Sequence, residues 1–221
     1  MSFPAIALQG ADPGALMISL VAGEGSGSHA WLHAAALNAG PSATCNVADM
    51  LHLLSLLHGI HPGLIDVAAT HNVWSGADAW LLAASAGFAA ERDYLADLIV
   101  AAGPVPGTPG EAATVTAVLA QRQALDTIAR SDRFGCAIGA VAGLLLDWLP
   151  IRAVLDTAAE RLGVPAPALS LPDEEETSTL LLAMPPHPRL DRTLAFGARQ
   201  LLVHHRCLIE LLETRAGARV E

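Results

Sequence analysis

Histidines and carboxylates at helical spacing are the residues of this chain whose types could support chemistry. His29 and His33 are four residues apart, and Asp49 and His52 are three apart, so each pair would share one face of a helix. Two such side chains on one face are the minimum from which a helix builds a metal site. The His29–His33 pair lacks the intervening glutamate of the zinc protease motif. The carboxylate-x-x-histidine spacing of Asp49 and His52 is present in a single copy. A metal centre is therefore one hypothesis among several.

A carboxylate also interrupts the apolar face of a long predicted helix at residues 76–102. Glu91 lies in phase there with Trp80, Ala84, Leu95 and Leu98. A buried carboxylate must be paired, protonated or bound to a metal. In the next predicted helix, Arg122 and Asp126 fall in phase with apolar residues as well. We expect a buried Glu91–Arg122 or Arg122–Asp126 ion pair inside a bundle, with a functional carboxylate site as the alternative.

Two further polar residues fall within apolar stretches. Asp147 interrupts the apolar run 134–149, and Arg152 follows it across Pro150. This arrangement predicts a structural salt bridge at a junction between two helices. His205 shares a face with Leu194, Ala198 and Leu212, which is typical of a hydrogen-bonded core histidine. The predicted buried polar residues are Glu91, Arg122, Asp126, Asp147 and Arg152.

Several reaction classes are excluded by missing residues. All twelve basic residues are arginine, so a Schiff-base lysine, a pyridoxal phosphate anchor and a P-loop lysine are all absent. Glycines occupy positions 23, 25 and 27, but Ser28 stands where a dinucleotide-binding loop has its last glycine. This stretch also lacks the pattern of a serine hydrolase. We interpret it as a flexible loop.

Composition limits the partners. The chain has 221 residues, 52% of them hydrophobic, and a net charge of −10, which argues against a nucleic-acid partner. The longest apolar run, 134–149, is shorter than the about 20 residues of a membrane span. The first residues lack the features of a secretory signal, and Cys45, Cys136 and Cys207 fit reduced thiols. We expect a cytoplasmic protein with no membrane partner.

Capping residues, prolines and glycines divide the chain into helices. The first 28 residues are expected to be irregular. Helices are predicted at about 29–37, 46–58, 62–70, 76–102, 108–130, 134–149, 150–162, 173–184 and 188–214. Strand patterns are not recognised. The sequence predicts one all-α domain over residues 1–221, in which seven or eight of these helices form a compact bundle.

Gly135, Gly139 and Gly143 form a ridge of small residues along one predicted helix. Glycine costs about 1 kcal/mol per helical position relative to alanine, so this helix needs a closely packed partner. The neighbours in sequence, which carry Glu91 and Arg122, are the expected partners. A Gly139→Leu change should then cost several kcal/mol.

Four segments resemble a bacterial family of unknown function. They are LHGIHPGLID at 57–66, AERDYL at 90–95, AAGPVPGTPG at 101–110 and SDRFGCAIGA at 131–140. They lie within the stretch 51–162, which makes up about half of the chain. The resemblance supports the division into helices and implies no activity.

The predicted bundle also resembles ferritin-like proteins, whose metal sites use carboxylates and two Glu-x-x-His motifs. Only Asp49-x-x-His52 approaches that motif here. The resemblance implies iron or manganese at a degenerate site, with Asp49, His52, Glu91 and Asp126 as ligands.

Three functions follow as hypotheses. The first is a binding or structural module without a cofactor, for which a homodimer remains open. The second is a non-haem metal oxidoreductase. The third is a small-molecule pocket lined by Trp80, Glu91 and Arg122. The sequence does not decide whether the protein is an enzyme, and it names no ligand.

Overall fold

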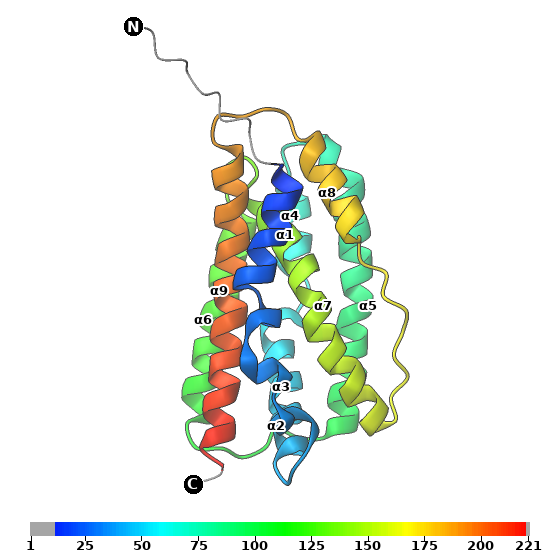
Figure 1. The fold of residues 1–221 in the computed structure, drawn as a ribbon, viewed down its shortest axis with the longest axis vertical. Helices are drawn as coiled ribbons and strands as arrows, with labels where there is room; N and C mark the ends of the chain where they lie inside the picture. The colour runs from blue at the N-terminus through cyan, green and yellow to red at the C-terminus, as the bar shows by residue number, and fades with distance from the viewer. Residues whose placement is uncertain (1–11, 220–221) are drawn as a thin grey trace, which may run out of the picture.

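A computed structural model describes residues 12–219 of the chain, and within them it contains nine α-helices and no strand. Figure 1 shows the order of the helices along the chain. Their bounds are α1 Pro13–Glu24, α2 Ala35–Asn38, α3 Ala43–His58, α4 Leu64–Thr70, α5 Asp78–Ala102, α6 Glu111–Ala129, α7 Cys136–Leu162, α8 Glu174–Ala183 and α9 Leu190–Gly217. The prediction of an all-α bundle is confirmed.

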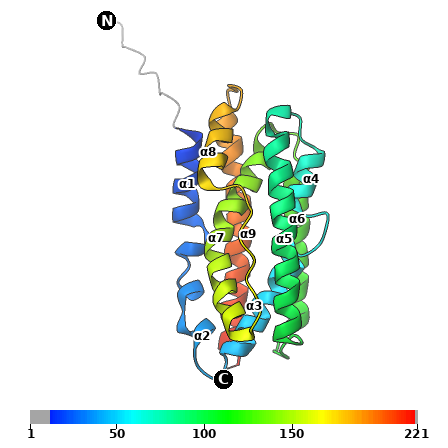
Figure 2. The same cartoon turned by 90° about the vertical axis from the view of Figure 1, so that its right-hand side faces the viewer.

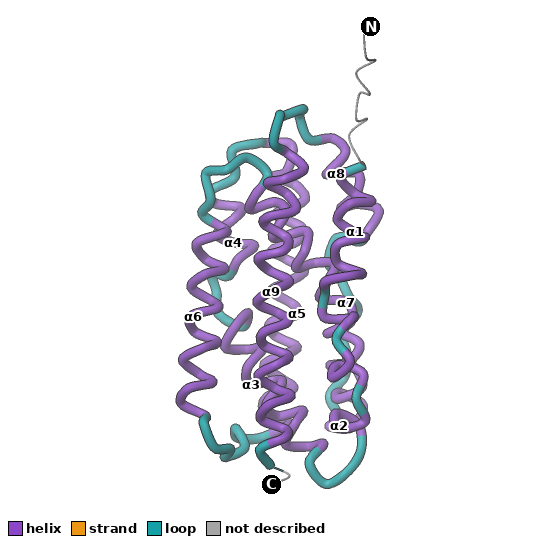
Figure 3. The backbone as a smooth tube through the Cα atoms, turned by 60° about the vertical axis from the view of Figure 1, so that its left-hand side comes forward, coloured by secondary structure: helices purple, strands orange, loops and turns teal. Residues whose placement is uncertain are grey.

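The four longest helices, α5, α6, α7 and α9, run along the long axis of the molecule (Figure 1). Turning the molecule shows α4, α5 and α6 on one side and α1, α7 and α8 on the other (Figure 2). Helix α3 contacts α5, α6 and α9, and α4 contacts α5 and α6. Helix α6 therefore lies beside both α3 and α4, as Figure 3 also shows.

Helix α7 is the central core helix. Most of its side chains between Cys136 and Trp148 are buried, and Trp148 is among the largest fully buried residues. By length and hydropathy α7 is apolar enough to cross a membrane, but 72% of its most apolar window is buried inside the fold. Burial against neighbouring helices accounts for this apolar character, because a helix that is apolar on all sides belongs in a core or a bilayer.

The predicted boundary at Pro150 is wrong, because α7 continues through it from Cys136 to Leu162. A proline inside a helix removes one backbone hydrogen bond and costs about 3 kcal/mol. The helix continues because residues on both sides of Pro150 are buried against the bundle, including Trp148 and Ile151. Packing therefore overrides the local signal.

The glycine ridge packs against α9 and not against its neighbours in sequence. A Cβ atom on Gly139 would overlap the carbonyl oxygen of Leu194, and one on Gly197 would overlap that of Cys136. A Cβ on Gly143 would lie 3.2 Å from the Cα of Ala198. The two backbones are in direct contact, and α7 and α9 form the most extensive helix pair of the described fold. The close packing was predicted correctly, but the partner was not.

Local signals misplace several helix starts. Residues 13–24 form α1, which Asp12 caps by accepting from the N–H of Gly14, so the prediction of an irregular segment over 1–28 is wrong there. Residues 1–11 lie outside the described residues. The predicted helix at 29–37 is divided into a 3₁₀ turn, Ala30–His33, and the short α2. Helix α6 begins at Glu111 after Gly110, and not at the predicted start near residue 108.

Candidate functional site

Four polar side chains from four separate elements form one hydrogen-bonded chain through the core. Ser26 donates to Asp147 from its backbone N–H, at 2.6 Å, and from its hydroxyl, at 2.7 Å. His205 Nδ1 lies 2.7 Å from Asp147 Oδ2, and His205 Nε2 lies 2.7 Å from His58 Nε2. All four residues are buried. We call Ser26, Asp147, His205 and His58 the buried polar chain.

His58 is held among aromatic rings. The centroids of Phe88 and Trp148 each lie 6.0 Å from that of His58, with their planes nearly perpendicular to the imidazole. Burial, followed by the charges of His205 and Arg92, lowers the pKa of His58 well below 6.5. The imidazole is therefore neutral at physiological pH and carries one unprotonated nitrogen.

His58 also lines a pocket of about 450 Å³ bounded by the end of α3, the turn to α4, the start of α4 and one face of α6. Its remaining lining residues are Leu57, Ile60, Pro62, Gly63, Leu64, Leu119, Arg122, Gln123, Leu125 and Asp126. Six of the eleven lining residues are leucine, isoleucine or proline, and His58, Arg122, Gln123 and Asp126 add polar groups to the wall. The size is typical of small-molecule sites.

The two predicted polar residues of α6 lie at this pocket and are only half-buried, so the prediction that Arg122 and Asp126 are buried is wrong. Asp126 forms a two-contact ion pair with Arg130, at 2.8 and 3.1 Å, and this hydrogen bonding lowers the pKa of Asp126. Within residues 12–219, no ion pair or side-chain hydrogen bond forms at Arg122. The pocket therefore contains a cation that no neighbouring carboxylate neutralises at contact distance.

Glu91 is buried as predicted, but its partners come from α7 and not from α6. Trp148 Nε1 donates to Glu91 Oε2 at 2.8 Å, and Arg152 donates to Oε1. Burial raises the pKa of Glu91, and the hydrogen bond from Trp148 and the charge of Arg152 act against that rise. Arg152 also donates to Asp156, at 2.7 Å, and to the Pro167 carbonyl.

The predicted salt bridge between Asp147 and Arg152 does not form. Asp147 accepts from Ser26 and His205, whereas Arg152 pairs with Glu91 and Asp156. The predicted burial of both residues is confirmed. They are five positions apart in one continuous helix, which places them on different faces.

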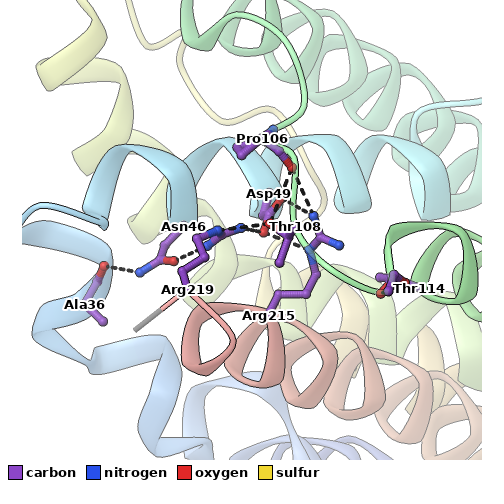
Figure 4. Close-up of polar contacts among 9 residues, drawn as sticks. Ala36, Asn46, Asp49, Pro106, Thr108, Thr114, Arg215 and Arg219 are labelled. Atoms are coloured by element: carbon purple, nitrogen blue, oxygen red, sulfur yellow. Dashed lines mark hydrogen bonds and ion pairs between the residues drawn. The ribbon is translucent and has the colours of Figure 1, made fainter. Parts of the chain in front are cut away.

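Asp49 is enclosed by arginines at the C-terminal end of α9, as Figure 4 shows. Arg215 donates to its two carboxylate oxygens at 2.8 and 2.9 Å, and Arg219 donates to Oδ2. Arg219 also donates to the Asn46 side chain and to the Thr108 hydroxyl. These bonds fix the C-terminal end of α9 to α3 and to the segment before α6.

The four predicted metal ligands do not converge. His52 Nε2 lies 2.9 Å from the Gly103 carbonyl, while Asp49, Glu91 and Asp126 pair with arginines on three different elements. His33 Nε2 lies 2.7 Å from the Gly27 carbonyl, and His29 accepts from the Trp31 backbone. Among residues 12–219, no group of three or more histidines, cysteines or carboxylates is placed to hold a metal ion.

The prediction of a pocket lined by Trp80, Glu91 and Arg122 is wrong. Of these three residues, only Arg122 lines the pocket between α3, α4 and α6. Trp80 and Glu91 are buried on α5, away from that lining. Sequence reasoning missed His58 and Ser26. Their partners lie 147 and 121 positions away in the chain, so no local spacing signals the buried polar chain.

Residues 21–220 match a family described as a family of unknown function (DUF6975). No curated protein and no solved structure matches the chain. The match extends well beyond the four segments that carried the resemblance in the sequence. Because it spans most of the chain, the protein belongs to this family of unknown function.

Proposed function

We propose that the protein is a binding module for a small carboxylic acid with an apolar body, which it holds in the pocket between α3, α4 and α6. The observation that carries this proposal is that one pocket contains both buried His58 and Arg122, which has no ion-pair partner among residues 12–219, beside several leucine side chains. An unpaired guanidinium beside apolar surface favours an anionic group attached to an apolar one.

Each part of such a ligand has a counterpart in the pocket. The guanidinium of Arg122 presents a planar set of donors that matches a carboxylate. The leucines at positions 57, 64 and 125 are buried and supply the apolar wall. Buried His58 supplies a polar group. Asp126 lies close by, but its charge is balanced by Arg130, so it opposes an incoming anion only weakly.

Mandelate is a suitable probe, since it combines a phenyl ring, a carboxylate and a hydroxyl group. We expect isothermal titration calorimetry to detect its binding to the full-length protein. Arg122→Gln should weaken that binding roughly 10-fold or more, because hydrogen bonds to charged groups contribute about 1.5–3 kcal/mol. The matched control is Arg199→Gln, which removes an exposed arginine of α9 that pairs with Glu24. That variant should bind as the wild type does.

Benzyl alcohol separates the contribution of charge from that of shape, because it keeps the ring and the hydroxyl but lacks the carboxylate. Benzyl alcohol should bind the wild type more weakly than mandelate does. It should bind the wild type and Arg122→Gln with equal affinity. Mandelate affinity that is unchanged in Arg122→Gln would contradict the proposal, as would the absence of mandelate binding.

The proposal needs no metal or other cofactor. A ferritin-like oxidoreductase is not favoured, because the carboxylates at 49, 91 and 126 are each already bound by arginine. Those arginines supply the positive charge that a metal ion would bring.

The same proposal places the protein in the cytoplasm, without a nucleic-acid or membrane partner. The three free cysteines, the net charge of −10 and the burial of α7 support this placement. A homodimer remains compatible with it, and light scattering on the purified protein measures the oligomeric state directly.

A further inference from the structure

The buried polar chain determines which nitrogen of each histidine carries a proton. The Asp147 carboxylate only accepts hydrogen bonds, so His205 Nδ1, 2.7 Å away, must donate. In a neutral imidazole the other nitrogen is then an acceptor, so His205 Nε2 accepts. His58 Nε2 lies 2.7 Å from it and must be the donor. His58 Nδ1 is left without a proton.

This bare nitrogen belongs to a residue that lines the pocket. Within residues 12–219, His58 Nδ1 has no hydrogen-bond partner, and it is not among the fully buried polar atoms that lack one. It is the one nitrogen of the His58 ring left free, and the His58 side chain forms part of the pocket wall. Asp147 and His205 do not line this pocket and influence it only through His58.

We propose that His58 Nδ1 is the proton acceptor of the pocket, held in the bare form by Asp147 and His205 as positioning residues, and that it recognises a hydroxyl or amine donor on the bound acid. This inference rests on the proposed function for the identity of the ligand, whereas the positions of the protons are a property of the free protein. The predicted ligand class narrows to carboxylic acids that also carry a hydrogen-bond donor.

The buried polar chain also provides a route along which a proton can move. When a ligand O–H transfers its proton to His58 Nδ1, the proton on His58 Nε2 passes to His205 Nε2. His58 is neutral again, with its proton on Nδ1, and His205 becomes an imidazolium ion beside Asp147. The ligand oxygen keeps the electron pair and becomes an anion. One proton leaves the ligand, one arrives at His205, and the total charge is unchanged.

The charged and titratable groups around His58 agree with a bare Nδ1. Arg92 on α5 acts on His58 in the same direction as burial, and His205 on α9 is the hydrogen-bond partner of His58 Nε2. Arg122 and Asp126 on α6 lie in the lining of the shared pocket, and Asp147 on α7 acts through His205. Burial and the positive charge of Arg92 oppose protonation of the His58 ring. The ring is therefore ready to accept a hydrogen bond.

Long-range ¹H–¹⁵N spectra of the histidine side chains of the full-length protein test the proposal directly, because they distinguish bare from protonated ring nitrogens. We expect a bare Nδ1 on His58 and a protonated Nδ1 on His205 at pH 7.5. A protonated His58 Nδ1 would overturn the proposal. This measurement uses the wild-type protein without ligand, so it does not depend on a variant that folds or on the choice of probe.

Asp147→Asn supplies a test that a purely structural role would not pass. An amide in place of the carboxylate can donate to His205 Nδ1, which reverses the chain and leaves His58 with a protonated Nδ1. We expect that exchange in the spectra. Unchanged protonation of both histidines in the folded variant would count against the positioning role.

Phenylacetate, which lacks the hydroxyl of mandelate, connects the proton pattern to binding. Wild-type protein should prefer mandelate over phenylacetate roughly fivefold, the value of one net hydrogen bond. Asp147→Asn should lose that preference while it still binds phenylacetate, because Arg122 is unchanged. If neither acid binds but the wild-type spectra show the bare Nδ1, the proposed ligand class is wrong, whereas the proposed positions of the protons on His58 and His205 are correct. If both acids bind equally to the wild type, His58 does not recognise the hydroxyl.

Discussion

At the scale of single residues, burial determines the behaviour of the ionisable groups. His58 is 5% exposed and Asp147 is fully buried, yet both oxygens of Asp147 and the Nε2 atom of His58 have hydrogen-bond partners. A buried imidazole without a carboxylate in direct contact stays neutral, because charging it in a medium of low polarity is costly. His58 therefore couples the stability of the fold to pH.

We expect stability to fall as the pH drops below about 6.5, the value for an unfolded histidine. The unfolded chain then takes up a proton at this site and the folded chain does not, because the folded pKa is lower. The contribution is complete above pH 6.5 and is lost at up to about 1.4 kcal/mol per pH unit as the pH approaches the folded pKa.

Chemical denaturation at a series of pH values checks this dependence. His58→Gln should show a shallower loss of stability between pH 6.5 and 5 than the wild type. His187→Gln, at an exposed histidine, serves as the control and should keep the wild-type slope. Equal slopes in all three proteins would be incompatible with a depressed pKa at His58.

Asp49 provides a second residue-scale prediction. Asp49→Asn leaves Arg215 buried and Arg219 mostly buried without a counter-charge, and should destabilise the fold by about 3–5 kcal/mol. Asp126→Asn is the matched control, since its pair with Arg130 is about half exposed on both sides and should change stability by about 0–1 kcal/mol. Thermal unfolding of the two variants measures both, and similar losses in the two would refute the distinction.

For single ionisable residues, the sequence predicts burial better than it predicts the hydrogen-bond or ion-pair partner. Glu91 in phase with an apolar face is buried, because helical periodicity is a local property. Its partner Arg152 lies 61 positions away, and the partner of His58 lies 147 positions away. Such pairs depend on how helices pack, and one sequence carries no direct record of that packing. This is why Arg122 was predicted as a partner of Glu91 and was found at the pocket.

At the scale of elements, the contact between α7 and α9 holds the buried polar chain together. Each of these helices contributes one residue to the buried polar chain, Asp147 from α7 and His205 from α9. Their hydrogen bond requires the two backbones to approach closely. The glycines of the ridge and Gly197 permit that approach, since a Cβ on Gly139 or Gly197 would overlap backbone of the facing helix.

A substitution in the ridge should therefore affect both stability and the polar chain. Gly139→Leu should cost about 3 kcal/mol or more, because the overlap is with backbone, which cannot rotate away. Gly23→Ala in α1 is the control, since a Cβ there meets no atom within 4 Å, and it should stabilise by about 0.5–1 kcal/mol. Denaturant titrations measure both changes. A mild effect of Gly139→Leu would mean that the two helices are not in close contact.

Element boundaries illustrate what local signals can and cannot decide. The helix predicted at 173–184 begins at Glu174, and Asp173 and Glu176 form a capping box there. Pro150 was predicted to end a helix, yet α7 continues because both of its flanks are buried. Local rules hold where a helix end is exposed, and tertiary packing overrides them inside the core.

At the scale of the whole molecule, the bundle uses arginine where a metalloprotein would use a metal ion. The carboxylates of Asp49 and Glu91 bind arginines at different places in the fold. We expect elemental analysis of the purified full-length protein to find iron, manganese and zinc well below one atom per chain. His52→Ala should leave those values unchanged. A near-stoichiometric metal that His52→Ala removes would contradict this account and support the ferritin-like alternative.

The pocket and the buried polar chain together form the central claim, and one titration tests both. Histidine side-chain ¹H–¹⁵N spectra of the wild-type protein are recorded while mandelate is added. The account predicts a bare His58 Nδ1 whose signal shifts to saturation as mandelate binds, while the signals of exposed His187 remain in place. A His58 Nδ1 that is protonated from the start, or that does not respond to mandelate at any concentration, would contradict it.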